Sequence, residues 1–474
     1  MYCNECGTEN DDHAIYCVED GYPLQQPSLA GSLQIRNEKF CGKCMTERKF
    51  ADRYCMECGN SFDTYDSAKQ AYEIEHTYFN KALGMKVLPG FILSIAVLFI
   101  LNQIFASLMK AGTGQFNGIF LGLNFPNHEK ITTLDYVLFS NLISTTTTMK
   151  AEEFSNQVSY LSSGMIFPVL MVILALAAGG FLIKYLHPQI EAWKAAAVFA
   201  GAYALVLGAL SFGGGAEYME NITRDTVRHT FQFSTTSAII NGIILGFFFS
   251  YAGMALKRGV LTKKLYVFAY QRALYFGTYA FIAVYGVLLL ITAFLHAQYE
   301  PETQMNVQRP ELPWYTTIAI VSKLAVYVFN LVFFNTFVMK DTGTESEPIE
   351  YSFLTGLSDK EMEGLPFLLP PEMFASYEVI LIVLVAVIFL FIGRLLGESQ
   401  QHIMKTVIMY SLVFAVLFTF FTYHASMNYQ VEHDQMMEEA MKIFVGFGTI
   451  KTFVITALYA GVTGFIGAQT RKLF

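Results

Sequence analysis

The chain lacks the short motifs and the charge pattern that would point to an enzyme or a nucleic-acid-binding protein. It contains no H-E-x-x-H motif, no G-x-S-x-G motif and no P-loop. Only 15% of its 474 residues are charged, the net charge is −8, and no dense run of Lys and Arg is present. Cysteine is absent after position 58. We therefore expect a non-catalytic protein that does not act on nucleic acid.

What the chain does have is seven cysteines in two copies of one pattern. The first copy has three cysteines and an aspartate where a fourth would stand, at Cys3, Cys6, Cys17 and Asp20. The second copy is complete, with Cys41, Cys44, Cys55 and Cys58. Ten residues separate the two halves of each copy. Two C-x2-C turns can close a tetrahedron of thiolates around zinc, so the pattern predicts one to two Zn²⁺ ions.

The fourth ligand of the first site has three interpretations. A carboxylate can bind zinc, so Asp20 can complete the site, and His13 is an alternative ligand. The first copy can also be a weakened site that holds no metal. A disulfide framework is the other interpretation of so many cysteines, but the odd count, the absence of a signal peptide and the C-x2-C spacing argue against it.

This segment resembles the paired zinc ribbons at the start of many polytopic membrane proteins of Gram-positive bacteria. Besides the cysteines, the resemblance rests on Gly7, Gly21 and Gly59, which follow the second position of a knuckle, where a left-handed backbone is often needed. The resemblance implies a first ribbon at 1–21, a linker at 22–40 and a second ribbon at 41–61. Because thiolate zinc sites belong in the cytosol, we expect the ribbons to be cytosolic, and we interpret them as a module that docks on a cytosolic or membrane protein.

The rest of the chain is apolar enough to be a membrane protein, with 54% hydrophobic residues and a mean hydropathy of +0.40. A polar stem at 62–86 precedes the first apolar segment. Nine segments have the length that a lipid bilayer requires, at 87–109, 165–185, 195–212, 236–256, 273–295, 316–337, 377–396, 406–423 and 448–468.

An internal repeat reduces these nine segments to eight spans. Segment 237–258 aligns with 451–472, which places Gly253 opposite Gly467. In the same alignment 131–150, which is too polar to span, takes the place of 316–340. We therefore read 316–337 as an outward-side helix or re-entrant segment. The predicted fold is mainly α, with four-span repeats at 87–258 and 273–474 in the same orientation, related by an axis along the membrane normal.

The charges of the short loops set the predicted orientation. With eight spans and cytosolic ribbons, the inside loops carry the basic residues Lys184, Lys194, Lys257, Arg258, Lys263, Lys264, Arg394, Lys405, Arg471 and Lys472. The outside loops at 338–376 and 432–439 are acidic. This pattern predicts a bacterial cell-membrane protein with both termini in the cytoplasm.

Few polar side chains in the spans invite a functional interpretation. Asn102, Gln103 and Asn241 are uncharged, and we interpret them as interhelical hydrogen-bonding residues. His424 and His433 lie near the outer face beside acidic residues, where a divalent cation could bind. We interpret both histidines as solvated loop residues.

Three functions fit the sequence in decreasing order. The first is a non-catalytic scaffold or envelope-state sensor, in which the ribbons dock a partner and the spans are an anchor in the lipid bilayer. The second is a transporter or permease component with a cavity between the repeats. The third, a membrane enzyme acting on lipid, lacks a catalytic constellation. A polar cavity between the repeats would favour the transporter, and a tightly packed interface would favour the scaffold.

Overall fold

The computed structural model divides the chain into two units, Met1–His76 and Thr77–Phe474. The structure describes residues 8–10, 14, 16–19, 21, 81–111, 132–150, 155–163, 166–188, 190–222, 225–256, 269–298, 314–341, 348–357, 377–397, 403–433 and 441–470. The first unit is represented by the few described residues between 8 and 21.

Eight described helices of the second unit are long and apolar enough to cross a membrane. They are α2 (Lys81–Ala111), α4 (Val169–Leu186), α5 (Ala192–Gly213), α6 (Thr235–Ala255), α7 (Ala269–Gln298), α11 (Glu378–Leu396), α12 (Ile403–Ala425) and α13 (Thr449–Thr470). A helix satisfies its own backbone hydrogen bonds, which lipid cannot do. The prediction of eight candidate spans is confirmed for this part of the chain, and the fold is that of a multi-pass helical membrane protein.

The surface of α11 illustrates why these helices fit a bilayer. Val383, Val387 and Phe391 are more than half exposed, whereas Val385 and Phe389 on the other face are fully buried. Both faces are therefore apolar, although only one packs against protein. A helix that is apolar all round and half exposed is stable in lipid, because the exposed face contacts acyl chains instead of water.

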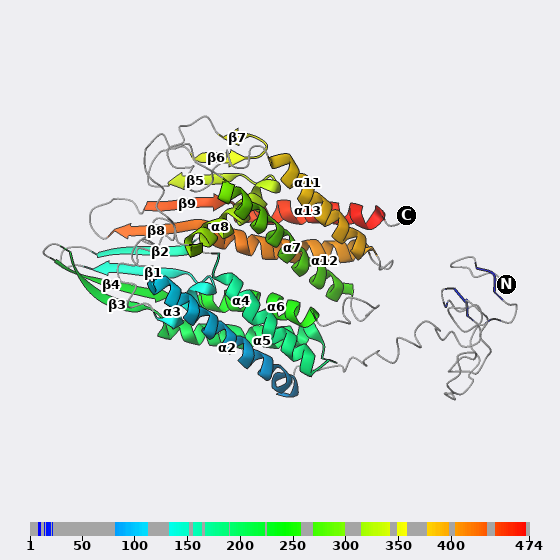
Figure 1. Cartoon of the computed structure of the whole chain (residues 1–474), viewed down its shortest axis with the longest axis horizontal. Coiled ribbons are helices and arrows are strands. Elements are labelled where there is room, and N and C mark those ends of the chain that lie inside the picture. The colour runs from blue at the N-terminus through cyan, green and yellow to red at the C-terminus, as the bar shows by residue number, and fades with distance from the viewer. Residues whose placement is uncertain are drawn as a thin grey trace. The chain divides into compact units, whose positions relative to one another are not determined.

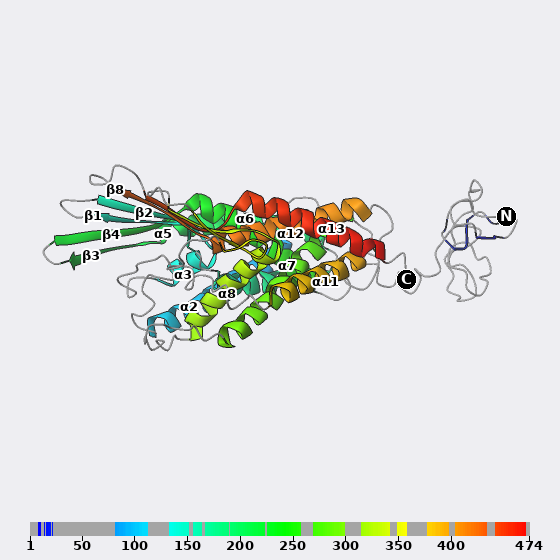
Figure 2. The same cartoon turned by 90° about the horizontal axis from the view of Figure 1, so that it is seen from above.

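Two further helices, α3 (Thr133–Ser140) and α8 (Trp314–Val332), lie on the same side of the sheet described below (Figure 2). The apolar part of α8, Ile320–Val332, is too short to count among the eight spans. Just after each helix, the left-handed position that glycine usually occupies is held by another residue, Leu142 (φ 59°) after α3 and Phe334 (φ 60°) after α8. Such a residue ends a helix because it turns the next amide back toward the last carbonyl groups.

The strands form one sheet of nine strands at one end of the spanning helices (Figure 1). They are β1 (Thr145–Lys150), β2 (Ser155–Ser163), β3 (Ala216–Ile222), β4 (Asp225–Phe233), β5 (Phe337–Asp341), β6 (Ile349–Ser352), β7 (Gly356–Leu357), β8 (Met427–His433) and β9 (Met441–Phe447). Their order is β3-β4-β1-β2-β8-β9-β5-β6-β7, and all neighbours are antiparallel. The sheet is continuous because β2 pairs with β8, with Val158 opposite Val431.

This sheet is absent from the fold predicted above, in which loops connect the helices. Strand β1 reads TTTTMK, which has the β-branched residues of a strand but no alternation of apolar and polar positions. The hairpins are joined into one sheet by three pairs of strands that are distant in sequence, β1 with β4, β2 with β8 and β5 with β9. A pattern within one segment carries no information about such pairs.

The spanning helices pack as two sets, with α2, α4, α5 and α6 in the first set and α7, α11, α12 and α13 in the second. Small residues allow the backbones to approach closely in both sets. A methyl group on Gly180 of α4 would collide with the backbone oxygen of Ser250 on α6. In the second set, a methyl group on Gly393 of α11 would collide with the backbone oxygen of Gly464 on α13. The helices therefore cross at two closely packed points.

Candidate functional site

Of the predicted zinc ligands, Cys17 is described, and its surroundings suit a metal-binding knuckle. The residue is fully buried and makes no disulfide. Asn10 Nδ2 lies 3.6 Å from Cys17 Sγ, and the amide of Gly21 donates to the Cys17 carbonyl oxygen at 3.0 Å. Gly21 is left-handed (φ 72°), which confirms the conformation predicted for it. A donor aimed at the sulfur favours a thiolate, the form of cysteine that binds zinc.

The remaining predicted ligands lie outside the described residues, so the structure does not test the two zinc sites. They are Cys3, Cys6, Asp20, Cys41, Cys44, Cys55 and Cys58, together with the alternative ligand His13. In the described part of the chain, no group of three or more His, Cys, Asp or Glu side chains is placed to hold a metal ion.

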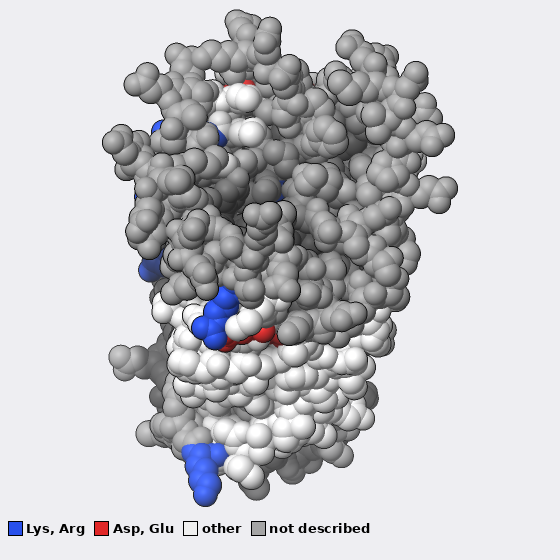
Figure 3. Space-filling model, turned by 90° about the vertical axis from the view of Figure 1, so that its left-hand side faces the viewer, with Lys and Arg blue, Asp and Glu red and all other residues white. Residues whose placement is uncertain are grey.

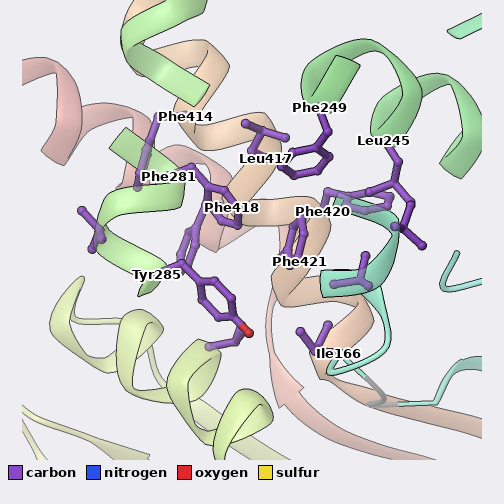
Figure 4. Packing of buried hydrophobic residues seen from close by; sticks show 14 of the residues in the cluster. Ile166, Leu245, Phe249, Phe281, Tyr285, Phe414, Leu417, Phe418, Phe420 and Phe421 are labelled. Carbon is purple, nitrogen blue, oxygen red and sulfur yellow. The ribbon is translucent and has the colours of Figure 1, made fainter. Parts of the chain in front are cut away.

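The two sets of helices meet along a surface of buried apolar side chains, which we call the junction (Figure 4). The junction residues come from α6, α7, α12 and the turn before α4, and they are Ile166, Leu245, Phe249, Phe281, Leu417, Phe420 and Phe421. The ring of Phe421 lies 6.3 Å from that of Phe249 and 4.7 Å from that of Phe281. Packing of this kind fills the space between the helices at these positions with apolar side chains.

In the first set, two buried asparagines, Asn141 and Asn241, connect the end of α3 to two spanning helices. Asn241 of α6 donates from Nδ2 to the carbonyl oxygens of Asn141 (3.1 Å) and Leu142 (2.7 Å). The hydroxyl of Tyr203 on α5 donates to Asn141 Oδ1 at 2.7 Å. The interpretation of Asn241 as an interhelical hydrogen-bonding residue is confirmed.

In the second set, Asn330 of α8 makes a comparable connection. Its Nδ2 donates to Thr422 Oγ1 on α12 at 2.9 Å, and its Oδ1 accepts from Thr452 Oγ1 on α13 at 3.3 Å. Asn335, just after the helix, also donates to Asn330 Oδ1 at 3.2 Å. All four side chains are essentially inaccessible to solvent. Buried hydrogen bonds of this kind hold a short helix in one position.

The other two polar residues singled out from the sequence differ from each other. Asn102 donates to the carbonyl oxygen of Leu98 in its own helix, and its Oδ1 has no hydrogen-bond partner. Its interpretation as an interhelical residue is therefore wrong. Gln103 is exposed and accepts a hydrogen bond from Thr133 Oγ1 of α3, which does connect two helices.

Asp135, in the first turn of α3, is a buried carboxylate that no sequence motif marks. It is 1% exposed. Its two oxygens accept from the Thr132 amide and hydroxyl and from the Gly215 amide, each at 2.7 Å. Burial, with a smaller contribution from the charge of Asp135, raises the pKa of the neighbouring Tyr136 phenol to about 12. The N-terminus of α3 adds a favourable dipole to this arrangement.

Lys323 is buried within α8, at 8% exposure. Its ammonium nitrogen lies 5.6 Å from the centre of the Tyr327 ring. No described carboxylate pairs with it. Ser322 precedes Lys323 in α8, and its carbonyl oxygen accepts a hydrogen bond from the hydroxyl of Tyr285 on α7 at 3.4 Å. In Figure 4 this hydroxyl points toward α8. The sequence marks Lys323 as a polar break in an apolar segment, but not as a buried charge.

His424 is not a solvated loop residue, and this prediction is wrong. It lies in the last turn of α12 and is only 4% exposed, with its ring 4.6 Å from that of Phe420. The predicted span ended at residue 423, whereas the helix continues for two more residues, to Ala425. His433 lies in β8, where its backbone pairs with Asn156. The two histidines belong to different elements, and no described cation site joins them.

The end of the molecule that carries the strands has few charges on its described surface (Figure 3). Blue and red atoms adjoin at one place in this view. One exposed ion pair, between Arg228 of β4 and Glu217 of β3, connects neighbouring strands. An exposed pair contributes little to stability.

Comparison with protein-family models, with curated proteins and with solved structures finds no match for this chain. The function is therefore argued from the residues and their geometry.

Proposed function

We propose that the chain is a non-catalytic membrane scaffold whose cytosolic zinc ribbons dock a protein partner, with the helical body serving as the anchor. The observation that carries this proposal is the junction. Phe249 and Leu417 are fully buried there, and the aromatic contacts continue through Phe421 to Phe281. A transporter needs a polar path between its two halves, whereas an anchor needs only a stable contact.

We further propose that the two sets of helices are a repeat in one orientation. Their elements follow the same order, which is helix, short helix, strands, two helices, hairpin and helix. The close contact of Gly180 with Ser250 has its counterpart in that of Gly393 with Gly464, at nearly the same sequence offset. The left-handed ends of α3 and α8 are a second shared feature. Both observations support a duplication.

We also propose that the sheet lies outside the cell and that both chain ends are in the cytoplasm. The described helix ends away from the sheet carry Lys184, Lys194, Arg394 and Lys405, as the positive-inside rule requires of a cytoplasmic side. Lys184 donates to the Ile190 carbonyl oxygen at 2.8 Å, which holds this connection at the helix ends.

The topology is tested with a reporter enzyme that is active only in the cytosol. Fusion after Lys264 should give activity, and fusion after Ser358 should give none. Activity after Ser358 would make α8 a true span, and the proposed four-plus-four repeat would then be lost.

The docking role is tested by purifying the protein from membranes and identifying what accompanies it. Deletion of residues 1–62 should remove the partner while the body stays folded. Cys55→Ser, which removes a zinc ligand, should also remove it, whereas Met56→Ser in the same turn should not. Retention of the partner by the Cys55→Ser protein would contradict the proposal.

The alternative is a transporter or permease component, which the duplicated helical sets favour. It predicts that the truncated body carries solute in reconstituted vesicles. It also predicts that substitution of a buried polar residue such as Asn241 stops this flux.

A further inference from the structure

Among the residues that the structure describes, two side chains with a formal charge are buried, Asp135 and Lys323, and they differ in the partners that surround them. Asp135 receives hydrogen bonds from two backbone amides and one hydroxyl, so its charge is compensated within the chain. Lys323 has the face of the Tyr327 ring beside it and no described carboxylate. Three N–H donors on one buried cation therefore have no anionic acceptor in the described chain.

The neighbours of Lys323 do not supply a negative charge. Tyr327 donates its hydroxyl proton to the carbonyl oxygen of Ala425 at 3.2 Å, and Tyr285 donates to that of Ser322 at 3.4 Å. Both phenols therefore act as neutral donors. Residues 321–333 are buried without interruption, so the ammonium group is largely removed from water. A buried charge without a partner is unfavourable by several kcal/mol, and inside a membrane protein it marks a functional site.

A second nitrogen-bearing side chain lies in the same region. His424 precedes Ala425, the residue whose carbonyl accepts from Tyr327. It is 4% exposed, and its described contacts are with the rings of Phe420 and Tyr423. Tyr327 therefore contacts the Lys323 ammonium group within α8 and hydrogen-bonds to α12 at Ala425, the residue after His424, and no described acidic side chain contacts either group.

We propose that Lys323 anchors a binding site for an oxyanion, a phosphate or carboxylate group, at the sheet end of the second set of helices. A lipid headgroup and a dissolved anion both offer this chemistry. The cation–π contact with Tyr327 fixes the ammonium group and leaves its N–H donors for the ligand. The site has no counterpart in the described part of the first set, where the buried charge is that of Asp135. This proposal goes beyond the scaffold role and does not depend on it.

The experiment measures the melting temperature of the full-length protein in a neutral detergent. Dioctanoyl phosphatidylglycerol, inorganic phosphate and acetate are titrated separately. Dioctanoyl phosphatidylcholine and chloride at matched ionic strength serve as controls. The variant is Lys323→Met, which keeps the length of the side chain. The matched control is Lys451→Met, because Lys451 is an exposed lysine at the same end, bonded to Thr336.

The wild type should show a saturable rise in melting temperature with at least one of the three anions. Lys323→Met should weaken the apparent affinity at least about tenfold, as expected for the loss of one charge-assisted hydrogen bond, and Lys451→Met should not. A response to phosphatidylglycerol alone assigns a lipid headgroup, and a response to phosphate or acetate assigns a dissolved anion.

Two results would overturn the proposal. One is that no anion stabilises the wild type beyond chloride, and the other is that Lys323→Met keeps the full response. Without anion, Lys323→Met should be at least as stable as the wild type, because it removes an uncompensated charge. If Lys323→Met and Lys323→Gln both fail to fold, the ammonium group has a structural role, and the proposal is wrong.

Discussion

Replacement of Asn241 by leucine tests whether the buried amide of the first set holds α3 in place. The substitution removes both hydrogen bonds to the carbonyl oxygens of Asn141 and Leu142, at 3.1 and 2.7 Å. Interhelical hydrogen bonds in membrane proteins contribute about 0.6 kcal/mol each, which gives about 1.2 kcal/mol for two. A buried acceptor left without a donor costs about 1–3 kcal/mol. We therefore expect Asn241→Leu to lower the free energy of unfolding by about 1–3 kcal/mol.

Asn102→Leu is the matched control, because it makes the same chemical change at an equally buried position. Asn102 bonds only within its own helix, and its Oδ1 is already unpartnered. Its replacement should leave the free energy of unfolding unchanged or raise it. Both variants are unfolded by denaturant in detergent micelles and followed by circular dichroism. Equal stability of the two variants, within about 0.5 kcal/mol, would refute the reasoning.

Two further predictions concern the zinc ribbons and the close helix contacts. Metal analysis of the fragment 1–62 should find one to two bound Zn²⁺ ions, and fewer after Cys55→Ser. Zinc binding should weaken as pH falls, because cysteine must lose its proton to bind zinc. Freshly purified fragment without zinc would contradict this prediction. In Gly253→Ala the added methyl group would collide with the backbone of Ala177, so this variant should lose about 1–3 kcal/mol of stability. Gly201→Ala is the control, because Gly201 has open space around it, and it should lose none. Equal melting temperatures of the two variants would contradict this prediction.

The helical part of the fold was predictable because hydropathy is a property of each segment by itself. Each of the eight predicted spans corresponds to one described helix, and α8, which the repeat alignment excluded from the spans, is also not among the eight candidates by length and apolar composition. The joining of the hairpins into one sheet was not predictable, because pairing such as that of Val158 with Val431 joins segments far apart in sequence.

The polar residues show the same limit at the level of single side chains. Asn102 and Asn241 are both asparagines in apolar helices, and the sequence ranks them alike. Their difference lies in what each faces, since Asn241 meets two carbonyl groups at the end of α3 and Asn102 meets its own helix. The burial of Lys323 and His424 likewise depends on neighbouring helices that no local pattern identifies.

The central claim is that the membrane body is a closed anchor, and cysteine labelling tests it most directly. The chain has no cysteine after position 58, so a single introduced cysteine reports on one place. Intact cells are treated with a membrane-impermeable maleimide, with the unsubstituted chain as the baseline. Leu417→Cys, at the buried junction, should stay unlabelled, whereas Met219→Cys, on a strand residue that is 66% exposed, should react. Labelling of Leu417→Cys at a rate near that of Met219→Cys would reveal a water-filled path and contradict the account.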